Sequence, residues 1–421
     1  MTDVAGDSGR AVEMRDALVD ALLGDGTIVS PEVARAFRAV PRHLFAVDEP
    51  LELAYDPNTA LVIKRDEEGL ALSSLSAAHI QAVMLEQAAV EPGMRVLEVG
   101  SGGYNAALLA DLVGPTGAVT TVDIDHEITD RARECLDRGG YDQVRVVQAD
   151  AEHGVLHGAP YDRIIVTMGA FDVPPAWREQ LSPGGRIVVP LRWRGITRSV
   201  AFDKISGEGE RADVADGSDG VLESRSYRLC GFVPAQGQGA HRELIVAIED
   251  GLFLRVDDRT EQFDADALRA AARMEPTEVG SGAIYDLPDE LELFLLTSSP
   301  RMVVLTADQA LVDEGRFNAS AGRGVPALIG EDSFAYRIRR SGPDGGLESA
   351  VLAYGPRGGQ LADRYCDLLR TWATRYRHRD VACIRYLPAG SPAATEVEAD
   401  GETARSLRTV KPHGVVETMW P

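Results

Sequence analysis

The chain has 421 residues, enough to bury a large core, and two or three domains are expected. Its formal net charge of -23 disfavours nucleic-acid phosphates and anionic membranes as partners, and favours a cationic ligand or a basic peptide. No run of about 20 apolar residues could span a bilayer, and residues 1–20 lack the order of a signal peptide, so we expect a cytoplasmic protein.

The first 90 residues are predicted to be mostly helical. Residues 14–23 and 30–40 carry apolar side chains at spacings of three and four, which is the period of an amphipathic helix. Ser30 followed by Pro31 is a typical helix start, with the serine as N-cap and the proline at the first helical position. A helical segment is therefore expected ahead of the next part of the chain.

The sequence pattern changes at Arg95, where short apolar stretches begin to alternate with helical ones. Strands are predicted at 95–99, 118–124, 143–148, 161–167 and 185–191, with helices at 105–113 and 127–140. This alternation is typical of a parallel sheet covered by helices on both faces. The fold class predicted for this part is therefore a doubly wound α/β sheet.

After Pro190 the pattern changes to antiparallel strands. Strands at 196–206 and 223–234 are expected to form a hairpin, joined by the acidic, glycine-rich stretch 207–220 as a solvated connection. Small residues at 236–240 are interpreted as a boundary between domains 1–236 and 237–421. The second domain is predicted to be α+β and to serve substrate recognition, with strands at 244–250, 251–258 and 381–390 and a long amphipathic helix at 358–379.

Metal and disulfide chemistry are not expected. The four cysteines are dispersed and have no zinc-site spacing, so buried free thiols are predicted at Cys135, Cys230, Cys366 and Cys383. His153 and His157 lie four residues apart, but no clear third ligand accompanies them.

The stretch EVGSGG at 98–103 ends a buried strand and precedes a helix. Glycines allow a sharp turn and let a ligand touch the backbone, and the free N–H groups of the following helix face such a ligand. The spacing departs from the GxGxxG of dinucleotide sites, and a purely structural turn remains an alternative. The candidate ligand-binding residues of this stretch are Glu98, Gly100, Ser101, Gly102 and Gly103.

Acidic residues also end the next two strands. Asp123 follows the glycines by about 20 residues, where an acid can accept two ribose hydroxyls. Asp150, with the small Ala151 beside it, ends the third strand and can meet an adenine edge. The bland alternative is that aspartates commonly follow strands as turn residues. Because an acidic rim suits a positively charged sulfonium better than a pyrophosphate, the predicted cofactor is S-adenosylmethionine.

With these motifs the sequence resembles the protein-L-isoaspartate O-methyltransferase family over roughly residues 15–236. The matching stretches are LSAAHIQAVMLEQ (75–87), VLEVGSGGY (96–104), TVDID, QAD, APYDRIIVTMGAFDVPPAWREQLSPGGRIVVPL (159–191) and CGFVP (230–234). The resemblance implies a Rossmann-like class I S-adenosylmethionine-dependent methyltransferase that releases S-adenosyl-L-homocysteine.

The resemblance also implies roles for individual residues. The stretch 98–103 would hold the methionine part of the cofactor, Asp123 the ribose, and Asp150 with Ala151 the adenine. His79 falls on a position that touches the cofactor in some members, although a packed or solvated histidine is the alternative. Ser76 falls on the active-site hydroxyl of the family, and its alternative role is the N-cap of the following helix.

This sequence departs from the family in three places. Its glycine turn is one residue shorter, Ala78 replaces a proline, and residues 237–421 have no counterpart in the compact repair enzymes. The extension resembles a branch associated with lanthipeptides and other ribosomally made, modified peptides. That branch implies methylation of an aspartyl side chain in a cyclised ribosomal peptide, giving an ester that closes to a succinimide and hydrolyses to isoaspartate.

Three other functions are kept as alternatives. The first is repair of protein isoaspartate, the activity of the compact enzymes. The second is a non-catalytic binding protein, against which the complete motifs argue. The third is an unrelated methyltransferase for a small molecule. In that case the similarity of the stretch 75–79 to the family would be a chance match.

Overall fold

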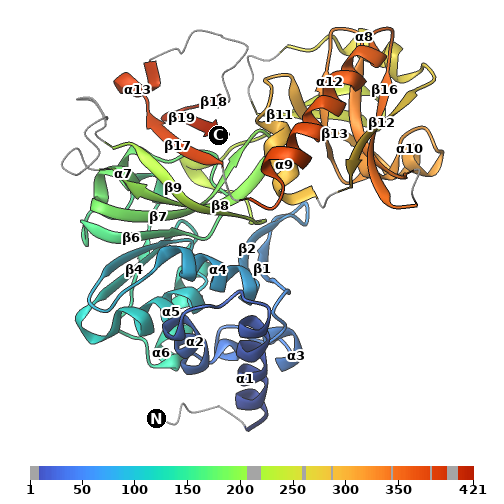
Figure 1. Cartoon of the computed structure of the whole chain (residues 1–421). Coiled ribbons are helices and arrows are strands. Elements are labelled where there is room, and N and C mark those ends of the chain that lie inside the picture. Colours follow the sequence, from blue (N-terminus) through green and yellow to red (C-terminus); the bar gives the residue numbers. More distant parts are fainter. Residues whose placement is uncertain are drawn as a thin grey trace.

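The computed structural model describes residues 9–205, 220–257, 262–285, 288–342, 345–379, 382–395 and 406–421. Its strands form a ten-stranded sheet, a seven-stranded sheet and a two-stranded hairpin. Figure 1 shows the N-terminal helices and parallel strands in blue to green below, and the seven-stranded sheet in orange above. The predicted acidic connection 207–220 lies outside the described residues except for Gly220.

The N-terminal segment is mostly helical, as predicted. A short β-hairpin precedes its last helix. Its helices are α1 (Gly9–Gly24), α2 (Pro31–Ala39), α3 (Leu51–Ala54) and α4 (Ala78–Ala88). Ser30 caps α2, because its side chain accepts a hydrogen bond from the Val33 N–H. The antiparallel hairpin of β1 (Leu61–Arg65) and β2 (Ala71–Leu75) was not predicted, although the segment is mostly helical as expected. Its turn is closed locally, since the Asp66 carboxylate accepts hydrogen bonds from two backbone N–H groups.

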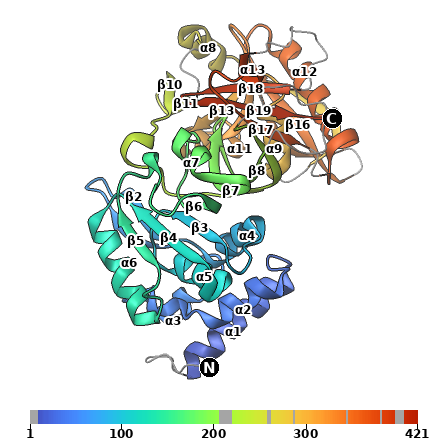
Figure 2. The same ribbon diagram turned by 90° about the vertical axis from the view of Figure 1, so that its left-hand side faces the viewer.

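The predicted doubly wound sheet is confirmed. Five strands run parallel in the order β5-β4-β3-β6-β7. They are β3 (Arg95–Val99), β4 (Ala118–Asp123), β5 (Arg145–Gln148), β6 (Tyr161–Val166) and β7 (Leu181–Trp193), connected through α5 (Tyr104–Val113), α6 (His126–Gly139) and α7 (Pro175–Gln180). Figure 2 shows α5 and α6 against these strands. The strand order reverses between β3 and β6, so a ligand crevice is expected at their carboxyl ends.

The same sheet continues through antiparallel strands from two distant parts of the chain. The predicted hairpin of β8 (Ile196–Lys204) and β9 (Leu222–Leu229) is confirmed. Beyond it lie β17 (Cys383–Pro388), β19 (Gly414–Met419) and β18 (Ser406–Lys411), which Figure 1 shows in red beside the green strands. The division at 236/237 therefore does not separate the two sheets, because β17 pairs with β9 and returns the C-terminal segment to the first one.

The second sheet is entirely antiparallel, which confirms an α+β C-terminal region. Its order is β10 (Leu244–Glu249), β11 (Leu252–Val256), β13 (Met302–Ala307), β14 (Val325–Ile329), β15 (Phe334–Ser341), β16 (Leu347–Tyr354) and β12 (Thr277–Ile284). The helices of this region are α8 (Ala265–Ala272), α9 (Pro288–Leu296), α10 (Gln309–Asp313), α11 (Ala319–Gly322), α12 (Gly358–Thr371) and α13 (Pro392–Thr395). The predicted helix 358–379 is α12 followed by a π-helical turn.

The two sheets are joined by polar and aromatic contacts. Arg194, in the β7–β8 turn, donates hydrogen bonds to the backbone carbonyls of Leu296, Ser299, Pro300 and Met302. Nearby, an aromatic cluster brings together Phe294, Trp372, Tyr376 and Trp420. One hydrophobic cluster accordingly runs through both sheets.

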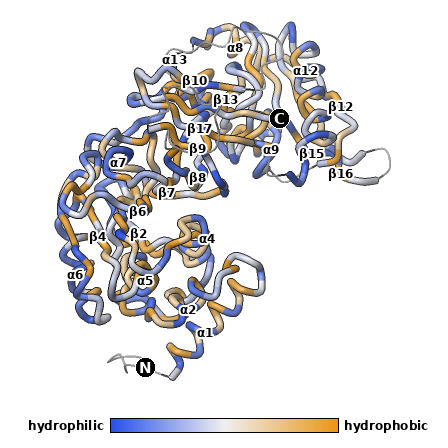
Figure 3. Tube along the Cα trace, turned by 60° about the vertical axis from the view of Figure 1, so that its left-hand side comes forward, coloured by the Kyte–Doolittle hydropathy of each residue, from blue (hydrophilic) through white to orange (hydrophobic). Residues whose placement is uncertain are grey.

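Hydrophobic and hydrophilic residues alternate along the outer helices, as the tube of Figure 3 shows for α6. The inner face of α6 buries Ile128, Ala132, Cys135 and Leu136, which attaches the helix to the sheet. All four cysteines are free thiols, but only Cys135 and Cys366 are buried as predicted, whereas Cys230 and Cys383 are partly exposed. Within the described ranges, every helix is too short or too polar to cross a membrane.

Candidate active site

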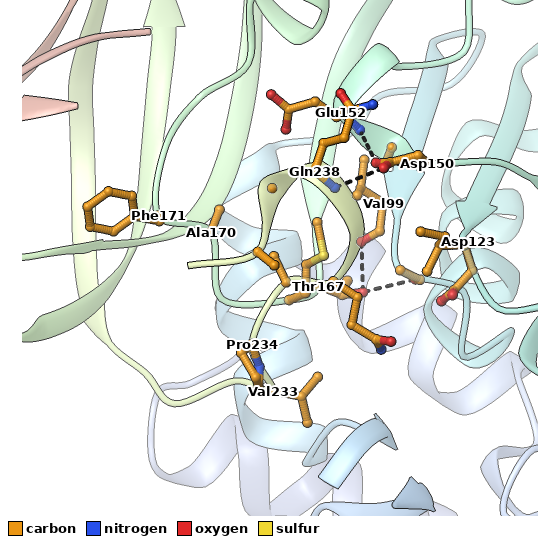
Figure 4. A pocket seen from close by; sticks show the side chains of 18 of the residues that line it. Val99, Asp123, Asp150, Glu152, Thr167, Ala170, Phe171, Val233, Pro234 and Gln238 are labelled. Carbon is orange, nitrogen blue, oxygen red and sulfur yellow. Dashed lines mark hydrogen bonds between the residues drawn. The ribbon is translucent and has the colours of Figure 1, made fainter. Parts of the chain in front are cut away.

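A tight glycine turn connects β3 to α5 at the crevice. Gly100 has a φ of +95° and Gly103 a φ of +82°, conformations that favour glycine. A Cβ on Gly100 would lie 2.5 Å from the Thr167 Oγ1. That hydroxyl shares its one proton between the carbonyl oxygens of Val99 at 3.0 Å and Gly100 at 2.9 Å, which Figure 4 shows as dashed lines. The turn is therefore held at the end of β6, with bare backbone at the crevice.

Glu98 supports this turn from inside the protein. Its side chain is fully buried, with one oxygen accepting from Asn105 Nδ2 at 2.9 Å and the other from Thr121 Oγ1 at 2.6 Å. Burial raises the pKa of this carboxyl to about 7, although both hydrogen bonds oppose the shift. Glu98 thus ties the turn to α5 and β4, and it lies behind the cavity wall rather than in it.

Asp123 and Ser101 meet where β4 ends. The Asp123 carboxylate accepts hydrogen bonds from the Ser101 N–H at 2.9 Å and the Asp125 N–H at 3.0 Å. Burial raises the pKa of Asp123, and these backbone bonds oppose the rise. The Ser101 hydroxyl is buried and makes no hydrogen bond within the described structure. A buried hydroxyl that has no hydrogen-bond partner at a cavity wall indicates that a bound ligand supplies the partner.

Asp150 lies at the end of the third strand, in a short 3-10 turn. One carboxylate oxygen accepts from the Glu152 N–H and the other from the Gln238 N–H, each at 3.0 Å. The neighbouring Ala151 carbonyl accepts a 2.6 Å hydrogen bond from the Trp177 indole. These hydrogen bonds fix the small residue and the acid side by side at the cavity.

These strand ends open into one cavity. Of the predicted residues, Gly100, Ser101, Gly102, Asp123, Asp150 and Ala151 line it. The remaining four lie outside the lining: Ser76, His79, Glu98 and Gly103. Gly103 is the N-cap of α5, and a Cβ there would lie 3.1 Å from the Phe45 ring.

Ser76 and His79 belong to the start of α4. The N-cap of this helix is Ala77, without a side-chain cap, so the capping alternative for Ser76 is wrong. The buried Arg42 holds the segment by donating to the Ser76 carbonyl at 2.8 Å. His79 Nδ1 lies 3.1 Å from the Pro57 carbonyl oxygen, as in the packed alternative. Two serines immediately upstream, Ser73 and Ser74, do line the cavity.

Several lining residues come from parts of the chain that the sequence did not connect with the site. They are Thr167, Phe171, Gln236, Gln238, His241, Pro412 and His413. Figure 4 shows the hydrogen bond from the Gln238 backbone N–H to Asp150, with Val233 and Pro234 lower in the view. Gln236, Gln238, Gly239 and Ala240 are therefore part of the cavity wall. The Gln236 side chain also donates to the Leu72 carbonyl at 3.3 Å.

The lining fits an adenosine that carries a sulfonium. Two carboxylates at strand ends, a turn of bare backbone and the orphaned Ser101 hydroxyl are the groups that such a nucleoside needs. Among the described residues, no group of three or more His, Cys, Asp or Glu side chains could hold a metal ion.

Comparisons with known proteins place this chain in one family. The family description of protein-L-isoaspartate(D-aspartate) O-methyltransferase matches residues 13–220. A protein-L-isoaspartate O-methyltransferase from Hyperthermus butylicus is 40% identical over 240 residues, which are 55% of this chain and 92% of that protein. Its counterpart from Methanopyrus kandleri is 39% identical over 231 residues, 54% of this chain and 94% of that protein.

Two solved structures are also similar. A protein-L-isoaspartate O-methyltransferase has a TM-score of 0.48 and 24% identity, over 88% of this chain and 96% of that one. A Plasmodium falciparum beta-aspartate methyltransferase in complex with S-adenosyl-L-homocysteine has a TM-score of 0.43 and 16% identity, over 53% of this chain and 98% of that one.

The family assignment rests on the sequence relatives, since this chain covers nearly the whole length of proteins 39% and 40% identical to it. The same residues form the doubly wound sheet and most of the cavity described above. The chain therefore belongs to the protein-L-isoaspartate O-methyltransferase family and is an S-adenosylmethionine-dependent O-methyltransferase.

Proposed function

We propose that this enzyme methylates the free carboxylate of an isoaspartyl residue in a protein or peptide. The observation that carries the proposal is the convergence of Asp123, Asp150 and the orphaned Ser101 hydroxyl on one cavity, in a chain of this family. The ester product can close to a succinimide when the following backbone nitrogen attacks the ester carbonyl, loses its proton and expels methanol. Hydrolysis of that ring returns aspartate or isoaspartate.

The chemistry needs little from the protein beyond position. S-adenosylmethionine supplies an electrophilic methyl group when it is bound. An acceptor carboxyl with a pKa of about 4 is already ionised at neutral pH, so no general base is required. The residues around the crevice then have to exclude water and orient the acceptor oxygen.

Two hydroxyl positions compete for the orienting role. The family resemblance assigns it to Ser76, whereas Ser74 lines the cavity and its carbonyl lies near the glycine turn, 3.8 Å from where a Cβ on Gly102 would be. Ser76→Ala and Ser74→Ala should be compared in methyl transfer at saturating cofactor. The variant whose kcat falls, with cofactor affinity little changed, identifies the orienting hydroxyl. Wild-type kcat in both variants would exclude an orienting serine at either position.

The substrate is tested with purified protein and radiolabelled cofactor. The acceptors are a linear isoaspartyl peptide and the same peptide with ordinary aspartate, which is the matched control. Turnover of the first peptide and none of the second is the expected result. Turnover of neither, by a protein that binds S-adenosyl-L-homocysteine, would refute isoaspartate as the acceptor.

A second candidate is methylation of an aspartyl side chain in a cyclised, lanthipeptide-like ribosomal peptide. It is favoured by one observation, that Gln238, His241, Pro412 and His413 line the cavity from residues 237–421, beyond the stretch that resembles the family. A cavity wall formed by these C-terminal residues can select a peptide substrate of a shape that the compact enzymes do not select. A cyclised peptide with one internal aspartate is the third acceptor in the assay, and its preference over the isoaspartyl peptide would favour this candidate.

A further inference from the structure

The last three strands of the chain contact the loops that carry the cofactor pocket. The turn between β18 and β19 places Pro412 and His413 in the cavity lining. The close approach of this turn to β17 requires glycine at 414, since a Cβ there would lie 2.5 Å from the Leu387 carbonyl oxygen. The C-terminal hairpin is therefore fitted to this position by backbone contact.

Asp172 is held on both of its carboxylate oxygens by this segment. The Tyr386 hydroxyl donates to Oδ1 at 2.5 Å, and the His413 backbone N–H donates to Oδ2 at 2.6 Å. The Tyr386 side chain is fully buried, and its hydroxyl also lies 3.2 Å from the Val173 carbonyl oxygen. Asp172 belongs to the loop after β6, which contributes Thr167, Met168 and Phe171 to the cavity.

His413 also reaches the loop on the other side of the cavity. Its Nε2 lies 3.0 Å from Glu152 Oε1, and Glu152 follows directly on Asp150 and Ala151. The Glu152 backbone N–H in turn caps the Asp150 carboxylate. One residue near the C-terminus thus connects the loop after β5 with the loop after β6.

A third contact supports the same loop. The Lys411 ammonium lies 3.4 Å from the centroid of the Phe171 ring, and the His241 ring stacks on Phe171 with centroids also 3.4 Å apart. The two groups must therefore lie on opposite faces of the Phe171 ring. Lys411 is anchored by its 2.8 Å hydrogen bond to the Arg192 carbonyl. Phe171 is in this way enclosed between β18 and the cavity wall.

We infer that Tyr386 and His413 are positioning residues of the methyltransferase site, which hold the loops after β5 and β6 in the cofactor-binding arrangement. This inference rests on the proposed use of Asp150 and Ala151 by the cofactor, and it extends the site to residues outside the family match. Hydrogen bonds that fix the residues next to a ligand contact preserve affinity through geometry. Both residues act through Asp172 and Glu152 and need not touch the reacting atoms.

The test measures binding of S-adenosyl-L-homocysteine by calorimetry, without an acceptor. His413→Ala and Tyr386→Phe should each weaken binding by about five- to tenfold, the effect of about one lost hydrogen bond. His413→Gln should restore most of the affinity, because its side-chain amide can still donate to Glu152. Val410→Thr is the control, as this side chain is 67% exposed on the same hairpin and should bind normally.

Methyl transfer to the best acceptor supplies the second readout. We expect the cofactor KM to rise in His413→Ala and Tyr386→Phe by the same factor as the dissociation constant, with a smaller change in kcat. Unchanged affinity and KM in both variants, with only a lower Tm, would overturn the inference. The two residues would then only stabilise the fold. If His413→Ala does not fold, Tyr386→Phe and His413→Gln decide the question.

This experiment separates the inference from the proposed function. Wild-type protein that binds S-adenosyl-L-homocysteine but methylates none of the acceptors refutes the function, while the binding comparison still tests the inference. Normal methylation by wild type, together with wild-type affinity in both variants, refutes the inference alone.

Discussion

The backbone N–H of Ser101 donates a 2.9 Å hydrogen bond to Oδ2 of Asp123, which ties the glycine turn after β3 to the end of β4. A single carboxylate therefore shapes the turn and faces the cavity at the same time. Because of this double role, Asp123→Ala and Asp123→Asn are expected to differ in their effect on cofactor binding.

Asp123→Ala should weaken S-adenosyl-L-homocysteine binding by about 10- to 100-fold, since hydrogen bonds to a charged group contribute about 1.5–3 kcal/mol. Asp123→Asn keeps an oxygen for the Ser101 N–H and should retain more affinity. Calorimetry on both variants checks this, with the exposed Asp142→Ala as control. Equal affinity in wild type and Asp123→Ala would remove Asp123 from the cofactor site.

The buried Glu98 should make stability depend on pH. Its pKa is raised to about 7 in the folded protein, so the folded state holds a proton that the unfolded state releases. The contribution of this group to stability is complete below the unfolded pKa of about 4.3, and it is lost as pH rises through about 7. Between pH 6 and 8 this group should cost about 1 kcal/mol of unfolding free energy.

Glu98→Gln removes that titration and should flatten the pH profile over the same interval. Urea unfolding at pH 6, 7 and 8 measures the difference between variant and wild type. An identical slope in both proteins would show that another group controls stability in this range.

Gly100→Ala should destabilise the protein by about 1–3 kcal/mol, because overpacking is added to an unfavourable backbone conformation. Gly69→Ala is the matched control, since Gly69 has a φ of +85° but no atom within 4 Å of the added Cβ. The added Cβ at Gly100 would meet Thr167 Oγ1, so Thr167→Ala in the same chain should recover part of the loss. Thermal melting of the three variants tests this, and equal effects at Gly100 and Gly69 would exclude the clash.

Arg194→Ala should loosen the contact between the two sheets. The truncation leaves carbonyl groups around residues 296–302 without their donor, at a cost of about 3 kcal/mol. We expect denaturant unfolding to become less cooperative, with the seven-stranded sheet melting first. Arg65→Ala is the control, because that guanidinium donates to the Gly69 carbonyl within its own hairpin. A single unshifted transition would contradict the prediction.

Local pattern was sufficient for the parallel sheet and for half of the cofactor site. Apolar strands alternating with amphipathic helices predict a doubly wound sheet, and such a sheet brings its strand ends to one edge. Asp123, Asp150 and the glycine turn could therefore be placed together from sequence alone. The hairpin of β1 and β2 was missed because each of its strands fully buries only one residue, so neither shows the alternation of a half-buried strand.

The sequence by itself determined the doubly wound sheet and the acids at its strand ends, because these depend on short-range periodicity and on a connection rule. The family was indicated by the resemblance of its motifs. Only the tertiary structure decided that β17 pairs with β9, across more than 150 residues, and that His413 reaches Glu152. Pairing between distant strands depends on which edges remain uncovered after the rest has folded, and no local pattern of residues records that.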